Sequence, residues 1–321
     1  MHCVARALLA AVLCAISVNA HAASLPVRDL NPLLSGYELP PALPSHHDGD
    51  SRLSAGVAVG NISLDQSAAH DTLLLDAELQ HWQFDFTRSS GDTLNLRIEL
   101  PYVRVSGGHL DHFIESFHGT FGLPNGNRDA WPGSRLLILH TYNGNADYRL
   151  AHSAQGIGDL ALRLGWSPNA LSTSTYNNTL WFTLKLPTGD ANRLAGSGAA
   201  DIALSLSASQ QLSSHFVTQQ QVSVSLLGQG KRLREQQETV VWSGSVGLDA
   251  MLTSHWSAVL QFDGHTKVFA TDLRALGNAL QFSLGAHYAT DMWKASLLVS
   301  EDIAVDTAPD VQFQFNLQRR F

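Results

Sequence analysis

The chain has 321 residues, of which 44% are hydrophobic and only 15% are charged, with a formal net charge of -8. Soluble domains usually carry about a quarter charged residues, so this chain is poor in charge without being strongly apolar. The composition excludes an acidic disordered chain and a basic nucleic-acid-binding protein. The sequence has no uncharged apolar run of about 18 residues or more, so a membrane-spanning helix is not expected.

The first residues have the pattern of a secretory signal peptide. A short basic start that ends at Arg6 precedes an apolar run over residues 7–18, and a small-x-small cleavage sequence follows. We therefore predict a cleaved signal over residues 1–22. Both cysteines of the chain, Cys3 and Cys14, lie within it. The mature chain then carries no thiol, so neither a disulfide nor a cysteine nucleophile is expected.

Residues 23–51 form a proline-rich segment without regular patterning. Its prolines are Pro26, Pro32, Pro40, Pro41 and Pro44. We predict that this segment forms no strand and lies either in the periplasm or as a plug inside the following domain.

From residue 52 to residue 321 the dominant pattern is alternation of apolar and polar residues, which is typical of strands. The clearest runs cover residues 94–102, 160–166, 180–186, 202–208, 240–252, 280–288 and 311–321. A soluble β-sandwich also alternates, but its outer face normally carries many lysines, and this chain has only four. The polar positions are mostly Ser, Thr, Gln, Gly and Asn, which favours a wet lumen opposite a lipid-facing apolar band. The fold class predicted is all-β: a transmembrane antiparallel β-barrel over residues 52–321, in the outer membrane.

The connections between these runs predict the orientation and the number of strands. Tight turns, such as residues 213–215 and 253–255, alternate with longer loops, such as residues 187–200. Short periplasmic turns opposite long extracellular loops are typical of outer-membrane barrels, which have an even number of strands. Asn143-Gly144 is a tight-turn signal within residues 136–152. Splitting that stretch into two strands gives about 14 strands, and reading it as one irregular loop gives 12.

The C-terminal run resembles the signal that the bacterial outer-membrane assembly machinery recognises. Alternating apolar residues lead to an aromatic residue at the end of the chain: Phe313, Phe315, Leu317 and Phe321. The resemblance implies that this machinery and outer-membrane lipid are partners of the chain.

A second resemblance rests on the loop after Pro101-Tyr102-Val103. The loop contains Gly107-Gly108, Leu110-Asp111, Phe117-His118, Phe121-Gly-Leu-Pro124 and Arg128. This pattern is similar to that of an uncharacterised Gram-negative outer-membrane family of unknown function. Residues 184–190 (Leu-Lys-Leu-Pro-Thr-Gly-Asp) and Gly196-Ser-Gly198 loosely resemble putative outer-membrane transport barrels. The resemblance implies a barrel and a location but no activity.

The loop over residues 106–134 contains the strongest cluster of chemically useful side chains. A short helix is expected over residues 109–118, and Asp111, Glu115 and His118 would then lie on one of its faces. This face either narrows the mouth of the barrel, binds a divalent cation, or is simply solvated. Arg128 is free to pair with an acid. No strict metal motif is present, so no metal or other cofactor is predicted.

The alternation also predicts which charged residues face the lumen. They are Glu78, Arg97, Glu99, Arg163, Lys185, Asp249, Asp263, Lys267 and Lys294. Both signs are present, so we expect ion pairs across a narrow lumen.

The leading functional hypothesis is a passive or gated channel for small solutes, constricted by the loop over residues 106–134. One alternative is a carrier of hydrophobic compounds with a hatch around Asn31-Pro32. Another is an outer-membrane enzyme acting on lipid, for which Ser, His and an acid must converge. The adjacent pair His152-Ser153 points to opposite faces of a strand, and no Gly-x-Ser-x-Gly elbow occurs, so an enzyme is not predicted. Nucleic acid is not expected as a partner.

Overall fold

The computed structural model describes residues 25–45, 50–91, 93–108, 135–168, 172–173, 175–303, 309 and 311–321. The predicted signal peptide lies outside these residues. Among the described residues, helices are limited to three short 3-10 turns, and none of them has the length or apolar character to span a membrane.

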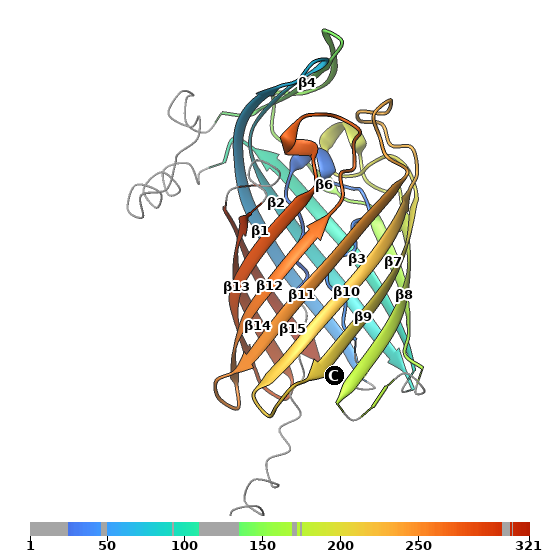
Figure 1. Cartoon of the computed structure of the whole chain (residues 1–321), viewed down its shortest axis with the longest axis vertical. Helices are drawn as coiled ribbons and strands as arrows, with labels where there is room; N and C mark the ends of the chain where they lie inside the picture. The colour runs from blue at the N-terminus through green and yellow to red at the C-terminus, as the bar shows by residue number, and fades with distance from the viewer. Residues whose placement is uncertain are drawn as a thin grey trace, which may run out of the picture.

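Alternating residues produce a closed antiparallel β-barrel of twelve strands (Figure 1). The wall strands are β1 (Ser51–Ser67), β2 (Asp71–Ser90), β3 (Leu94–Ser106), β7 (Leu160–Trp166), β8 (Tyr176–Leu186), β9 (Asp201–Gln211), β10 (Phe216–Leu227), β11 (Val240–Met251), β12 (Trp256–His265), β13 (Ala279–Ala289), β14 (Trp293–Asp302) and β15 (Val311–Arg320). Each wall strand pairs with the wall strands before and after it, with β3 next to β7, and β1 pairs with β15 from Arg52↔Arg320 to Asn61↔Val311, which closes the ring. The predicted fold class is confirmed.

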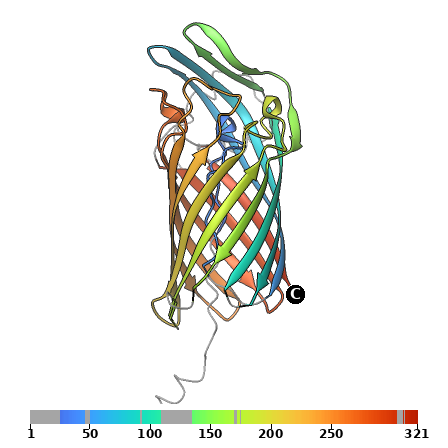
Figure 2. The ribbon, with the colours of Figure 1, turned by 90° about the vertical axis from the view of Figure 1, so that its right-hand side faces the viewer.

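The expected count of 14 strands is not confirmed, because the hairpin at Asn143-Gly144 lies outside the wall. The hairpin itself exists: β4 (Leu137–Tyr142) pairs with β5 (Asn145–Leu150). Asn143 and Gly144 have φ angles of 50° and 77°, and a two-residue type I′ hairpin turn requires positive φ at both positions. However, the only wall strand that β4 pairs with is β2, at its first residues, Asp71–Asp76. The 20 residues of β2 exceed the roughly 9–11 that cross a membrane. The hairpin therefore extends the sheet beyond one rim of the barrel (Figure 2).

The last extra strand, β6 (Ala154–Ile157), continues β7 beyond a bulge. Opposite β3, the pairing stops at Glu99↔Ala161 and resumes at Tyr102↔Ile157. Pro101 has no N–H for the ladder, and its carbonyl accepts from Gly158 at 2.8 Å. The bulge thereby inserts an extra residue and reverses the alternation in β6, where Ile157 is exposed, whereas Asp159 keeps the inward parity of Arg163 on β7.

The two faces of the wall differ as a membrane barrel requires. Outward side chains such as Leu164, Phe182 and Trp242 are exposed, whereas inward side chains such as Ser205 and Gln261 are buried. Since consecutive strand residues point to opposite faces, one row of apolar side chains faces outward and one polar row lines the lumen.

Residues 25–45, here called the N-terminal segment, lie inside the barrel (Figures 1 and 2). We call the end with the long connections, uppermost in Figure 1, the upper end. The segment rises to the 3-10 turn η1 (Pro32–Leu34) near that end and then descends along the opposite wall. The Asn31 side chain caps η1 by accepting the N–H of Leu33 at 3.1 Å. Every residue of the segment is buried or half-buried.

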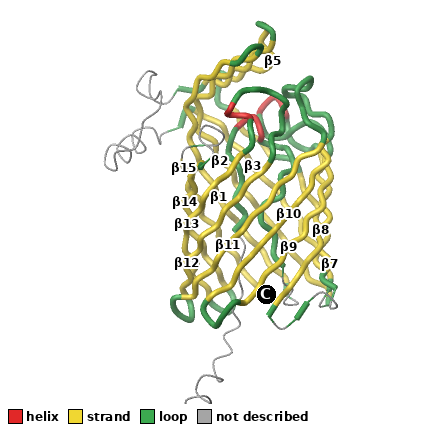
Figure 3. Tube along the Cα trace, in the orientation of Figure 1, coloured by secondary structure: helices red, strands yellow, loops and turns green. Residues whose placement is uncertain are grey.

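The upper connections pack over the turn of the segment. Two further 3-10 turns lie there, η4 (Ala191–Arg193) and η5 (Arg274–Leu276), drawn in red in Figure 3. The apolar core of the molecule forms between these loops, the upper part of β2 and β3, and the segment. Its larger members are Leu30, Leu33, Leu34, Tyr37, Ile62, Leu73, Leu75, Leu79, Val103, Val105, Ile138, Leu194, Leu227, Leu233, Val241, Val268, Phe269, Leu273 and Leu276.

Candidate functional site

An ion-pair network joins the rising part of the N-terminal segment to the wall. Arg28 of the segment pairs with Glu99 on β3. The same carboxylate lies 3.2 Å from Arg163 on β7 and 3.8 Å from Arg97 on β3. Glu99 and Arg163 are almost completely buried. Buried charges are tolerated only when they are paired and hydrogen-bonded, so this carboxylate depends on its arginines.

The descending part of the segment makes a second connection to the same network. Arg163 donates to Glu38 at 2.6 Å and to Thr183 on β8 at 2.9 Å. Arg97 in turn pairs with Asp85 on β2 at 3.0 Å. Three arginines therefore face three carboxylates, and the segment supplies one of each sign. Removal of the segment would leave two arginines and two carboxylates of this network on the wall, so their charges would remain balanced.

Lys185 on β8 holds a second cluster nearer the upper end. Its Nζ lies 2.8 Å from Asp159 and 2.9 Å from Asp201, and it donates to the carbonyl of Gly36 at 2.6 Å. Asp159 also accepts the N–H of Ser197 at 3.0 Å. One buried lysine thus ties the bulge, β9, the connection after β8 and the N-terminal segment together.

Close backbone packing explains the glycines around this cluster. Gly36 has a φ of 87°, which side-chain-bearing residues rarely adopt. A Cβ at Gly36 would overlap the backbone of Gly196, and a Cβ at Gly196 would overlap the Asp159 carboxylate. The turn of the segment can therefore reach the Gly196-Ser-Gly198 loop only because both positions lack a side chain.

Arg232, in the connection between β10 and β11, covers the turn of the segment from above. Its guanidinium donates to the carbonyls of Ala191, at 3.1 Å, of Gly196, at 2.8 Å, and of Ser35. It also lies 5.5 Å from the centre of the Tyr37 ring, in cation–π geometry. Burial lowers the pKa of Arg232. Burial also raises the pKa of Tyr37 to about 12, so its hydroxyl remains a donor at neutral pH.

Glutamine side chains of the wall bind the backbone of the rising part of the segment. Gln261 accepts the N–H of Leu25 at 3.4 Å and donates to its carbonyl at 3.0 Å. Gln314 and Gln312 on β15 donate to the carbonyls of Pro26 and Arg28, at 3.1 and 3.2 Å. The wall amides thus take the place of a neighbouring strand for this irregular backbone.

The descending part is bound in the same way on the opposite wall. Gln221 on β10 donates to the carbonyl of Pro41 at 2.9 Å and accepts the N–H of Leu43 at 2.8 Å. The indole of Trp181 on β8 donates to the carbonyl of Pro44 at 3.0 Å. The segment is therefore fastened to the wall along its length, rather than at one point.

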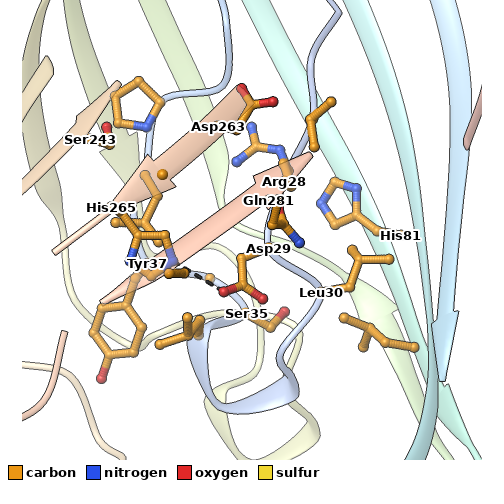
Figure 4. Close-up of a pocket in the computed structure, with 18 of the residues that line it drawn as sticks. Arg28, Asp29, Leu30, Ser35, Tyr37, His81, Ser243, Asp263, His265 and Gln281 are labelled. Atoms are coloured by element: carbon orange, nitrogen blue, oxygen red, sulfur yellow. Dashed lines mark hydrogen bonds and ion pairs between the residues drawn. The ribbon is translucent and has the colours of Figure 1, made fainter. Parts of the chain in front are cut away.

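A cavity of about 70 Å³ remains between the segment and strands β2, β11, β12 and β13. Arg28, His81 and Asp263 border this space, and Asp29 pairs with His265 at 3.1 Å (Figure 4). A buried water needs at least about 10–15 Å³ of such volume, so the cavity has room for about five waters.

The remaining predicted lumen charges lie on β11, β12 and β14. Asp249, Asp263 and Lys294 are on the inward faces of these strands. Asp249 accepts from Gln219 at 2.7 Å, and Asp263 accepts from Gln261 at 2.9 Å.

A serine, a histidine and an acid do come together in this part of the lumen. His287 Nδ1 lies 2.8 Å from the hydroxyl of Ser296, and its Nε2 lies 3.6 Å from Asp249. All three side chains are buried inside the wall. Both neighbours of β14 are paired with it around Ser296, so the ladders use the local N–H groups that an oxyanion hole would require. The arrangement suits wall packing better than acyl transfer.

Two predicted lumen residues lie elsewhere. Glu78 is on the face of β2 that also carries the exposed Trp82, because the register of β2 is continuous and only odd-numbered positions face inward. Lys267 lies after the end of β12 in an exposed connection. Alternation assigned Glu78 wrongly because the upper part of β2 extends beyond the band where outward residues must be apolar.

The four candidates in the long loop, Asp111, Glu115, His118 and Arg128, lie outside the described residues, as does the expected short helix. The two described ends of this loop are both on the outward face of β2. Gly108, with a φ of 71°, packs directly on the Glu78 side chain. Arg135 lies 3.9 Å from Asp76.

The predicted C-terminal signal residues lie on the last strand and just after it. Phe313, Phe315 and Leu317 share the outward face of β15. Phe321 follows this strand, is exposed, and exchanges backbone hydrogen bonds with Ser51.

Sequence reasoning missed several residues that shape the lumen: Arg28, Glu38, Asp159, Trp181, Gln221 and Arg232. Arg28 and Glu38 stand among only three charges within residues 25–45, which is a signal that these charges have partners. Trp181 and Gln221 occupy inward positions of alternating runs, so the same parity that selected Lys185 places them in the lumen. In the described part of the chain, no cluster of three or more metal-ligating side chains occurs.

Comparison with solved structures finds several similar chains. The COG4313 outer membrane channel from Pseudomonas putida F1 matches with a TM-score of 0.53 and 14% identity, over 88% of this chain and 100% of that chain. The KdgM porin matches with a TM-score of 0.44 and 6% identity, over 84% and 99%. A Pseudomonas aeruginosa FadL homologue matches with a TM-score of 0.40 and 10% identity, over 93% and 99%.

The first of these matches bears on the kind of fold. At 14% identity the first match shows an outer-membrane barrel fold and nothing finer, and the other two scores are too low for a functional comparison. A search among curated proteins finds no match. The resemblance to an uncharacterised family is confirmed by a family model that matches residues 2–321, so this chain belongs to the family described as protein of unknown function (DUF3187).

Proposed function

We propose that the protein is an outer-membrane channel for small polar solutes that the N-terminal segment holds closed. The observation that carries this proposal is that residues 25–45 fill the lumen and that none of them is exposed. The wall behind them is lined with Ser, Gln and paired charges, which suits a water-filled path once the segment moves. In this proposal the signal peptide directs export, and the end with short turns faces the periplasm.

The path of the segment is compatible with opening. Its turn, η1, lies near the upper end, whereas Ser45 and the start of β1 lie further down. The segment therefore enters the lumen as a loop that can be withdrawn without threading a chain end through the barrel. Withdrawal removes Arg28 and Glu38 together, so Arg163 keeps Glu99 and Arg97 keeps Asp85. Opening thus creates no large imbalance of buried charge.

Conductance in planar bilayers tests this proposal. We expect the full mature chain to be closed for most of the time, and a chain without residues 25–45 to conduct. The double variant Arg28→Gln, Glu38→Gln should raise the open fraction, because the two ion pairs that join the segment to Glu99 and Arg163 are lost while the wall pairs remain. Arg193→Gln is the matched control, since it removes only an exposed pair with Asp190.

Two results would overturn the proposal. A deletion chain that forms a folded barrel without conductance would contradict the channel. Equal conductance of the full and the shortened chain would contradict closure by the segment.

The loop over residues 106–134 enters this proposal only as a second barrier. A constriction formed by Asp111, Glu115 and His118 stays a prediction. The described ends of the loop lie outside the wall at Gly108 and Arg135, so we assign the main closure to the N-terminal segment.

A carrier of hydrophobic compounds is the second candidate, because the upper lumen is apolar. The segment contributes Leu30, Leu33 and Leu34 to the core, next to Asn31-Pro32, and its displacement would open an apolar chamber there. Binding of a fluorescent fatty acid to the shortened chain, with no ion conductance, would favour this candidate over the channel.

A further inference from the structure

Residues 36–45 of the N-terminal segment are here called the descending arm. The wall that faces this arm binds it as a binding site binds an extended peptide. Contacts to the arm's main chain come from wall side chains rather than from a paired strand. Lys185, Gln221 and Trp181 donate to the carbonyls of Gly36, Pro41 and Pro44. Asp201 accepts the N–H of Glu38 at 3.0 Å, and Gln221 accepts the N–H of Leu43.

These contacts match the chemistry of a proline-containing strand. The arm has the sequence Gly-Tyr-Glu-Leu-Pro-Pro-Ala-Leu-Pro-Ser, in which Pro40, Pro41 and Pro44 have no N–H. The wall supplies donors to the carbonyls of all three, with a further bond from Gln221 to Pro40 at 3.4 Å. A peptide with N–H groups at positions 40 and 41 would bury donors for which these contacts provide no acceptor. The wall therefore favours proline at these two positions, because proline has no N–H that would be left buried without an acceptor.

One side chain adds charge recognition. Glu38 binds the guanidinium of Arg163, which is fully buried and which Thr183 and Glu99 hold in place. A charge-assisted bond to a fixed guanidinium discriminates between an acidic and a neutral side chain. The side-chain donors of Lys185, Gln221 and Trp181, together with one arginine, form a site that recognises an extended acidic, proline-rich peptide, as in other modes of polyproline recognition.

We propose that the inward faces of β7 to β10 form a binding site for extended proline-rich peptides with an acidic residue, occupied within this chain by its own descending arm. When the arm leaves, the same site takes such a peptide from outside the chain. The proposal deepens the proposed function, since it names peptides as the class of molecule that the opened lumen retains. Binding, however, does not require that the barrel conducts.

Titration of a labelled peptide tests the site independently of conductance. The probe is a fluorescent peptide with the sequence of residues 35–45, added to the chain without residues 25–45 in detergent, with fluorescence anisotropy as the readout. We expect saturable binding. Replacing both Pro40 and Pro41 of the peptide by Ala should weaken binding at least about thirtyfold (about 2 kcal/mol), since two buried N–H groups are then left unpaired. Glu38→Gln in the peptide should weaken binding roughly tenfold.

A matched pair of barrel variants locates the site. Gln221→Leu removes the bonds to Pro40, Pro41 and Leu43 and should weaken binding at least tenfold. Gln219→Leu is the control, because this residue faces the same lumen but binds Asp249 instead of the arm. Equal binding by both variants, or equal binding of a scrambled peptide, would overturn the proposal.

A shortened chain that does not fold alone still gives an answer. The refolding yield is then measured by heat-modifiable migration in gels, with the peptide or its scrambled form present. Rescue by the native peptide alone supports the site, because a ligand that binds only the folded state stabilises it. Equal yields with both peptides contradict it. Binding of the peptide without conductance would uphold the peptide site and contradict the channel. Conductance without peptide binding would uphold the channel and contradict the peptide site.

Discussion

Lys185→Met is the most direct test of the buried charge cluster. The lysine side chain is 3% exposed, and its two partners, Asp159 and Asp201, are 2% and 0% exposed. Removing the cation leaves two carboxylates inside the protein without their shared partner. Loss of one member of a buried ion pair costs about 3–5 kcal/mol, and we expect a value toward the upper end here.

Equilibrium unfolding in urea, followed by tryptophan fluorescence, measures this loss. Lys267→Met is the control, because Lys267 is an exposed lysine in a connection and such substitutions change stability by less than about 0.5 kcal/mol. Adding Asp201→Asn to Lys185→Met should recover part of the loss, since it removes one of the stranded charges. A loss below about 1 kcal/mol for Lys185→Met, or no recovery in the double variant, would refute the reasoning.

Three further predictions concern the segment and the hairpin. Gly36→Val cannot keep the φ of 87° or the contact with Gly196, so the segment should leave the wall. Trypsin should then cleave after Arg28, which the parent chain protects; continued protection would show that the turn tolerates a side chain. Trp181→Phe removes a single bond to the segment and should cost about 1 kcal/mol in urea unfolding, and a cost above about 3 kcal/mol would mean that the indole does more than donate. Gly144→Val strains the hairpin turn, where φ is 77°, but leaves the wall intact, so hydrogen exchange should rise in β4 and β5 and not in β8. Raised exchange in β8 would contradict the separation of hairpin and wall.

The sequence was sufficient for the barrel because its walls obey one simple rule. Outward residues must be apolar in lipid, so alternation identifies strands and their faces, and the buried side chains of Arg97, Glu99, Arg163 and Lys185 lie on the polar face of the wall. The rule fails above the membrane, where outward positions can be polar. Glu78 was therefore assigned to the wrong face, and the hairpin at Asn143-Gly144 was counted as part of the wall.

The partners of the lumen charges could not be predicted from the sequence, for a different reason. Arg28 and Glu38 lie in a segment without periodicity, so no pattern gives the direction of their side chains. Asp159 has the inward parity of Arg163, but it lies before the start of β7, outside the alternating run over residues 160–166. Such contacts depend on which distant segments meet, and local sequence carries little information about that.

Closure of the ring between β1 and β15 has a consequence for biogenesis. The seam joins Arg52 to Arg320, so the cylinder cannot be completed until β15 has been synthesised. Contacts between residues so distant in the chain make folding slow, and the intermediates expose unpaired strand edges. The N-terminal segment immediately precedes β1 and is available throughout this interval, so the nascent sheet can curl around it as a template before the two edges meet.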